Sequence, residues 1–128
     1  MNEVRPTWDE YFLAIAKTVS LRADCRRRKV GSVIVLQNRI LSAGYNGAPS
    51  GDLGCLDGGC PRGLMSYEEV VASSAYDNCT AIHAEANALL YARTSLVGAT
   101  IYITSAPCND CKKLIAGAGI IRIIYSEE

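Results

Sequence analysis

The sequence is short of histidine, of aromatic residues and of net charge. Its 128 residues include one histidine, one tryptophan and one phenylalanine, and 13 basic residues balance 13 acidic ones. A balanced charge provides no overall field to attract a polyanion, and a 7% aromatic content leaves few rings to stack on nucleobases. No apolar run is long enough to cross a membrane. These absences favour small-molecule chemistry over nucleic-acid or membrane binding.

The length suits one domain, covering residues 1–128, with a single hydrophobic core. The N-terminal segment Met1–Pro6 is polar and is followed by an amphipathic stretch, which does not resemble a secretory signal. We therefore expect a cytoplasmic protein. In that reducing compartment, the six cysteines are expected to bind metal or to stay unpaired rather than to form disulfides.

Two short motifs together supply the ligands of a metal site. His83-Ala84-Glu85 contributes the only imidazole of the chain, and Pro107-Cys108-Asn109-Asp110-Cys111 contributes two thiols. Catalytic zinc uses three nitrogen or sulfur ligands and leaves a fourth position for water. At the start of a helix, the spacing of Cys108 and Cys111 places both sulfurs on one face. We therefore predict a catalytic zinc held by His83, Cys108 and Cys111.

Glu85 is the candidate catalytic residue, because it lies two positions after His83 and so points elsewhere around a helix. Each motif alone has an ordinary explanation. His83 could be a packed core residue, and the Cys-x-x-Cys pair could bind a structural zinc or act as a redox pair. A redox pair would leave His83 and Glu85 without a role. The combination of H-x-E with a distant P-C-x-x-C is typical of zinc-dependent nucleobase deaminases.

Hydrophobic periodicity predicts an α/β domain. The predicted elements are a helix from Trp8 to about Leu21, strands at 30–36 and 39–45 joined by a turn at Gln37-Asn38, a long loop at 46–67, a short helix at 68–76, a helix at 81–93, a strand at 99–104, a helix at 108–118 and a strand at 120–125. Right-handed crossovers between parallel strands would bring the starts of the last two helices to one edge of the sheet. That arrangement would place His83 beside the two cysteines.

At this level of detail, the chain resembles the cytidine and deoxycytidylate deaminase superfamily, and more narrowly its deoxycytidylate (dCMP) branch. The resemblance covers most of the chain and is carried by the motifs VGSVIV at 30–35, GYNGAPSG at 44–51, HAEANAL at 83–89, ATIYIT at 99–104 and PCNDC at 107–111. It implies a cytidine-deaminase-like three-layer α/β/α sandwich with a mixed central sheet. Relatives usually continue into another strand and helix beyond a strand such as 120–125, which leaves the usual C-terminal strand in question.

The resemblance also implies a reaction. Hydroxide supplied by zinc would attack C4 of the cytosine ring, while Glu85 moves protons to N3 and to the departing ammonia, and dCMP would become dUMP. By the same resemblance, Asn46 is expected to hydrogen-bond the sugar, and the Ala84 amide to donate to the base carbonyl. Arg27, in the one basic cluster at 26–29, is our candidate for the 5′-phosphate. The ordinary alternative for Arg27 is that the basic cluster is a solvated charged run. The ordinary alternative for Asn46 is that it serves only in an Asn-Gly turn.

Four further cysteines, Cys25, Cys55, Cys60 and Cys79, lie in or beside the long loop. Relatives suggest that they hold a second, structural zinc; separate buried or unpaired thiols are the alternative. The resemblance further implies a homo-oligomer, by family analogy a hexamer, and regulation by dCTP or dTTP with Mg²⁺ as a companion of the nucleotide.

Two other classes of function remain open at this stage. One is a deaminase acting on another cytosine compound: a modified-cytosine nucleotide, a nucleoside or a single-stranded nucleic acid. The other is a zinc-binding module without catalysis, which would have no need of Glu85. Turnover of dCMP, and its dependence on Glu85, separates these alternatives.

Overall fold

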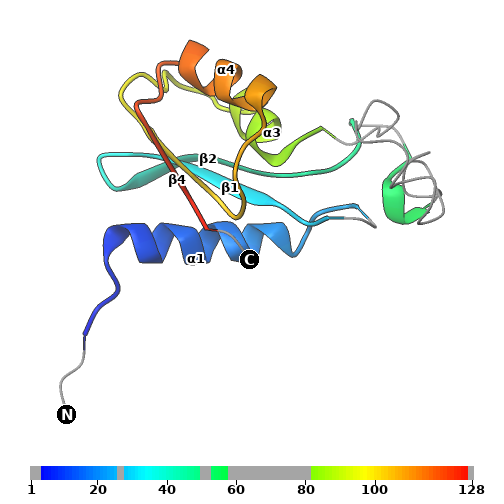
Figure 1. Ribbon diagram of the computed structural model, residues 1–128, viewed down its shortest axis with the longest axis horizontal. Coiled ribbons are helices and arrows are strands. Elements are labelled where there is room, and N and C mark those ends of the chain that lie inside the picture. Colours follow the sequence, from blue (N-terminus) through cyan, green and yellow to red (C-terminus); the bar gives the residue numbers. More distant parts are fainter. Residues whose placement is uncertain (1–3, 26–27, 50–52, 58–81, 127–128) are drawn as a thin grey trace.

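The computed structural model describes residues 4–25, 28–49, 53–57 and 82–126, and within these ranges the chain forms a sheet with helices on both faces (Figure 1). Four strands lie in the order β2-β1-β3-β4. The elements are α1 (Trp8–Ser20), β1 (Gly31–Leu36), β2 (Arg39–Tyr45), a 3-10 helix η1 (Cys55–Asp57), α3 (Ala84–Leu90), β3 (Thr100–Ile103), α4 (Asn109–Gly117) and β4 (Arg122–Tyr125). The predicted helix at 68–76 and most of the predicted loop lie outside the described residues.

Helix α1 covers one face of the sheet, below it in Figure 1. It begins with a capping box, in which the Thr7 hydroxyl accepts from the Glu10 amide and the Glu10 carboxylate accepts from the Thr7 amide. Its buried side chains Phe12 and Ala16 pack against Val33 and Tyr102 of the sheet. The helix predicted from Trp8 to about Leu21 is confirmed, and Thr7 is its N-cap.

Strands β1 and β2 form the predicted hairpin. Gln37 and Asn38 connect them, with φ of 52° and 60°. Two consecutive residues of positive φ match the twist of a tight hairpin. Strand β1 also pairs antiparallel with β3, whereas β3 and β4 run parallel. The sheet is therefore mixed, as the family resemblance implied.

Helices α3 and α4 cover the opposite face, where they lie next to each other (Figure 1). Ala84 and Ala88 of α3 and Ile115 of α4 join Ile34 and Ile101 of the sheet in the larger of the two buried apolar clusters that the described residues form. The two helices begin at the same edge of the sheet, as predicted. None of the helices in the described ranges is long and apolar enough to span a membrane.

Candidate active site and metal centre

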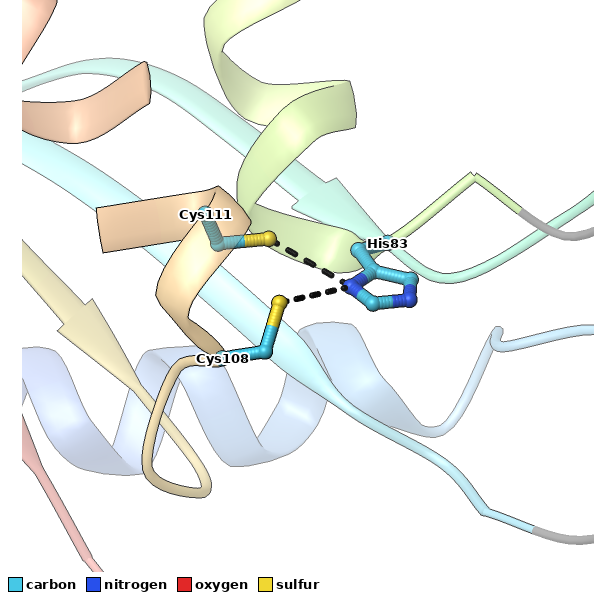
Figure 2. Close-up of side chains that lie close together, drawn as sticks. All are labelled: His83, Cys108 and Cys111. Carbon is cyan, nitrogen blue, oxygen red and sulfur yellow. Dashed lines mark hydrogen bonds between the residues drawn. The ribbon is translucent and has the colours of Figure 1, made fainter. Parts of the chain in front are cut away.

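Three potential metal ligands meet where α3 and α4 begin. His83 is the residue that precedes α3, Cys108 is the residue that precedes α4, and Cys111 lies in the first turn of α4. His83 Nδ1 lies 3.3 Å from Cys111 Sγ and 3.7 Å from Cys108 Sγ, and Figure 2 shows the ring nitrogen pointing at both sulfurs. The three ligand atoms all lie within 4.8 Å of one another. The predicted ligands are therefore brought together.

This geometry fits zinc. Zn–N bonds of about 2.0–2.1 Å and Zn–S bonds of about 2.3 Å at tetrahedral angles separate a nitrogen and a sulfur ligand by about 3.5 Å. The two separations of 3.3 and 3.7 Å bracket that value. One imidazole and two sulfurs also favour zinc over Mg²⁺ and Ca²⁺, which bind mainly oxygen ligands. In the described part of the chain, no other group of three such residues converges.

The Cys111 thiol is buried, and its environment holds its proton in the absence of a cation. Burial raises the pKa of Cys111 far above its usual range, and the nearby Glu85 carboxylate and Cys108 thiol raise it further. Metal ligation requires the thiolate, so a divalent cation at this point would supply the compensating charge. The same proximity places Glu85 beside the metal ligands without making it one of them.

A cavity of about 180 Å³ opens beside the ligands. Its walls come from four segments of the chain: Cys25, Arg28, Val30, Asn46, His83, Ala84, Glu85, Ser105, Ala106 and Cys108. Glu85 is 5% exposed and Ala84 is fully buried, so this wall is shielded from bulk water. A metal ligand set, a buried carboxylate and an adjoining cavity together form an arrangement that can carry out metal-assisted hydrolysis.

Asn46, the predicted sugar contact, lines the cavity, and its side chain already forms hydrogen bonds with the backbone. Its Oδ1 accepts from the Val30 amide at 2.8 Å, and its Nδ2 donates to the Arg28 carbonyl at 2.8 Å. An asparagine amide can make four hydrogen bonds. One acceptor lone pair and one N–H of Asn46 therefore remain for a ligand.

The basic cluster reaches the cavity through Arg28, which is exposed and lines it. Arg27, the predicted phosphate contact, lies outside the described residues. Sequence reasoning also passed over Ser105 and Ala106, which contribute to the cavity wall. Their position between a buried strand and the Pro107-Cys108 motif was the available signal, because ligands bind where strands end in α/β sheets.

Of the four cysteines predicted to hold a second zinc, only Cys25 has a described side chain. It is buried, it lines the cavity, and its sulfur accepts from the Arg28 amide at 3.4 Å. Cys60, Cys79 and the side chain of Cys55 lie outside the described part of the chain. The four-cysteine site therefore stays a prediction.

Comparison with known proteins links these residues to one family. The family model for the cytidine and deoxycytidylate deaminase zinc-binding region matches residues 6–127. The deoxycytidylate deaminase of Mycobacterium phage D29 is 51% identical over 127 residues, which cover 97% of this chain and 98% of that protein. The deoxycytidylate deaminase of Schizosaccharomyces pombe is 40% identical over 97% of this chain, which spans only 38% of the yeast protein.

The fold has a solved counterpart as well. The dCMP deaminase of cyanophage S-TIM5, in complex with dCMP and dUMP, matches with a TM-score of 0.74 and 31% identity, covering 96% of this chain and 83% of that one. The apo form of the same protein matches with a TM-score of 0.69 and 30% identity, covering 95% of this chain and 84% of that one. The arrangement of sheet and helices is thus similar to that of a solved dCMP deaminase.

Proposed function

Because the chain belongs to the cytidine and deoxycytidylate deaminase family, we propose that its cavity holds dCMP with the base against His83, Cys108 and Cys111 and the phosphate toward Arg28. The chain is a zinc-dependent hydrolase that converts dCMP to dUMP and ammonia. The observation that carries this conclusion is the convergence of three zinc-type ligands on a cavity that contains a buried carboxylate.

His83, Cys108 and Cys111 hold the zinc in this proposal. Bound zinc lowers the pKa of water toward neutrality, so that hydroxide is available near pH 7. Glu85 is the proton carrier: its carboxylate accepts one proton of the attacking water and gives it to N3 of the cytosine ring. It then accepts the second proton of the same oxygen, now bonded to C4, and delivers it to the amino group, which leaves as ammonia. Its burial in the cavity wall keeps these transfers away from bulk water.

Substrate recognition is assigned to the remaining cavity residues. The Ala84 amide is the first N–H of α3, a position with no partner within the helix, and it is proposed to donate to the base carbonyl. Asn46 is proposed to use its remaining amide hydrogen and lone pair for the sugar hydroxyl. Arg28 replaces Arg27 as the proposed phosphate contact, because a guanidinium at the cavity can bind phosphate with two parallel hydrogen bonds.

A substrate panel tests this proposal. Purified, zinc-loaded protein is incubated with dCMP, CMP, deoxycytidine, dCTP, 5-methyl-dCMP and a cytosine-containing single strand, and deamination is followed by its one-unit mass shift. We expect the highest kcat/KM with dCMP. Turnover of deoxycytidine or of the strand at the same rate would overturn the phosphate assignment while preserving the zinc chemistry.

The role of Arg28 has a separate test. Arg28→Gln leaves a shorter, uncharged amide in place of the guanidinium, and it should raise KM for dCMP while leaving turnover of deoxycytidine unchanged. Arg22→Gln is the matched control, because Arg22 is exposed and does not line the candidate cavity. An unchanged KM in Arg28→Gln would return the phosphate contact to the Arg27 position.

Other features of the family are proposed on resemblance. They are a cytoplasmic location, assembly into a homo-oligomer of six chains, binding of dCTP or dTTP with Mg²⁺ as effectors, and a structural zinc on Cys25, Cys55, Cys60 and Cys79. The backbone hydrogen bond to the Cys25 sulfur is compatible with a thiolate ligand. Mass measurement of the native assembly and the zinc content per chain test two of these proposals: six chains and two zinc ions are expected.

A further inference from the structure

Asn87 is a polar residue of the HAEANAL motif that the proposed mechanism does not use. It lies on α3, four residues after His83, and it does not line the candidate cavity. Its Nδ2 donates to the Tyr45 carbonyl at 2.8 Å, with a longer contact of 3.5 Å to the Ile82 carbonyl. Asn87 therefore touches no position proposed for substrate, but it joins two backbone segments that do line the cavity.

Each of these two carbonyls precedes a cavity residue. Tyr45 ends β2 and is followed by Asn46, while Ile82 is followed by the metal ligand His83. The same two segments also pair directly, through hydrogen bonds of 3.1 Å from the Gly47 amide to the Ile82 carbonyl and 2.7 Å from the Ile82 amide to the Gly47 carbonyl. Asn87 thus holds the end of β2 against the start of α3.

From Asn46 the same kind of contact continues toward Arg28. The Asn46 side chain fixes the Val30 amide and the Arg28 carbonyl, and the Asn46 amide donates to the Val30 carbonyl at 3.3 Å. A continuous series of side-chain-to-backbone hydrogen bonds therefore runs from the helix that carries Glu85 to the segment that carries Arg28. Its first link is Asn87.

We propose that Asn87 is a positioning residue that sets the distance between the metal half of the cavity and the half that receives the sugar and phosphate. The inference rests on the proposed function, because it assumes that dCMP spans both halves. A misplacement of about 1 Å between substrate and catalytic groups can cost about 100-fold in rate. A single amide that fixes two segments can therefore affect substrate binding without touching the substrate.

The chemistry of the contact requires an amide donor. Two carbonyl oxygens face the end of the Asn87 side chain, so the NH₂ group and not the oxygen must point at them. Asn87→Asp keeps the size and shape of the side chain but replaces the donor with an acceptor that repels both carbonyls. Asn87→Ala removes the group altogether. Both variants should loosen the link, and the aspartate variant at least as much.

The experiment compares these two variants with Ser42→Ala. Ser42 is a matched control, because its hydroxyl also ties β2 to α3, donating to the Ala88 carbonyl at 2.6 Å, yet it does not line the candidate cavity. Circular dichroism first establishes that each variant folds. If Asn87→Ala does not fold, the comparison is made with Asn87→Asp alone. The melting temperature, kcat and KM for dCMP, and inhibition by dUMP are then measured on zinc-loaded protein.

We expect the Asn87 variants to raise KM for dCMP and the inhibition constant of dUMP about tenfold or more, with a smaller change in kcat, because Glu85 and the metal ligands stay together. Ser42→Ala should lower the melting temperature and leave KM unchanged. Equal KM values in the Asn87 variants and Ser42→Ala would reduce Asn87 to a structural residue and overturn the inference. Wild-type protein that fails to deaminate dCMP would instead overturn the proposed function, and the inference with it.

Discussion

The two faces of the sheet both bury apolar side chains, but they differ in the hydrogen bonds that hold their helices. On the α1 face, apolar and aromatic side chains dominate: Phe12 is 1% exposed and contacts Tyr102, with ring centroids 5.3 Å apart, and Trp8 stacks on Phe12. Such a helix is stabilised by the apolar area that it buries, and this area changes little when the helix moves slightly along the sheet. This face carries none of the cavity residues in the described part of the chain.

On the opposite face, α3 combines the larger apolar cluster with a set of hydrogen bonds from side chains to backbone. Ser32, Ser42 and Asn87 each bond a carbonyl across the contact between α3 and the hairpin, at 3.0, 2.6 and 2.8 Å. Gly44 lets the helix backbone approach β2 closely, because a Cβ there would lie 2.5 Å from the Ala84 oxygen and the Ala88 nitrogen. Hydrogen bonds are directional and therefore fix the position of α3. They occur on this face, where Glu85 must be placed accurately.

The sharpest test of this division exchanges one glutamate on each face for glutamine. Glu85→Gln should lower kcat by about 10²–10⁴-fold, because the amide cannot carry protons, while zinc content stays unchanged. Glu10→Gln on α1 should leave turnover intact, since glutamine can still complete the capping box. Turnover and zinc content are measured for both. Near-normal turnover of Glu85→Gln would remove Glu85 from the chemistry.

Core truncation should separate the faces next. Phe12→Ala should lower the free energy of unfolding by about 3–5 kcal/mol, and Ile115→Ala by about 2–5 kcal/mol. Only Ile115→Ala should also weaken zinc binding, because Ile115 is buried one turn after the ligand Cys111. Urea unfolding and zinc competition with a chelator measure the two effects. Equal zinc affinity in both variants would contradict the prediction that only packing on the α3 and α4 face affects the metal site.

Two glycine substitutions provide a finer comparison. Gly31→Ala would push a methyl group into the Ala16 carbonyl of α1, and Gly44→Ala would push one into the Ala84 carbonyl of α3. Each should cost about 1–3 kcal/mol through overpacking. Gly44→Ala should additionally lower kcat, because it moves the helix that bears Glu85. If kcat falls equally in both variants, the position of α3 has no special role in turnover.

The smallest expected effect concerns the hydrogen bond that joins α1 to the sheet. The Tyr102 hydroxyl donates to the Asp9 carboxylate at 2.6 Å, and Arg122 donates to the same carboxylate at 3.1 Å. Burial, and then the bond to Asp9, raise the pKa of Tyr102 from 10.0 to about 12. The bond from Tyr102 is the main cause that lowers the pKa of Asp9 from 3.8.

The sign of the pH dependence follows from these shifts. The unfolded chain loses the Tyr102 proton before the folded one, so this contribution to stability is complete below about pH 10 and is lost between about pH 10 and pH 12. The Asp9 contribution is present above pH 3.8 and is lost as the pH falls below that value. Tyr102→Phe should flatten both slopes and cost about 1 kcal/mol or less near neutral pH, since the Asp9 side chain is 42% exposed. Thermal melting across pH measures this, and unchanged slopes would contradict it.

Local signals explain what the sequence could predict. The turn at Gln37-Asn38 and the helix predicted at 108–118 depend on residues close together in the chain, and each was placed to within about one residue. The helix predicted at 81–93 is shorter in the structure, where it spans Ala84–Leu90. The convergence of the ligands also follows from topology, because consecutive crossovers bring successive helix starts to one edge.

The missed features depend on contacts between distant segments. Ser32 reads as part of an apolar strand, yet its fully buried hydroxyl bonds the Ala84 carbonyl 52 residues later. A polar residue within an apolar strand was the available signal, because a buried hydroxyl must find a partner. Nothing local distinguishes Arg28 from Arg27 in a run of four basic residues. The structure places Arg28 at the cavity, where Asn46 bonds the backbone on either side of residue 29, whereas Arg27 lies outside the described residues.

His83 and Cys108 occupy N-cap positions, and neither side chain caps its helix. Serine, aspartate or asparagine at such positions typically adds about 1 kcal/mol of stability to a helix. The chain therefore carries a built-in trade-off between robustness and activity: redesign by stability alone would select better caps at these two residues and would erase the enzyme. A stabilised variant should consequently be sought elsewhere, for example on the α1 face, where gains in folding energy leave the ligand positions unchanged.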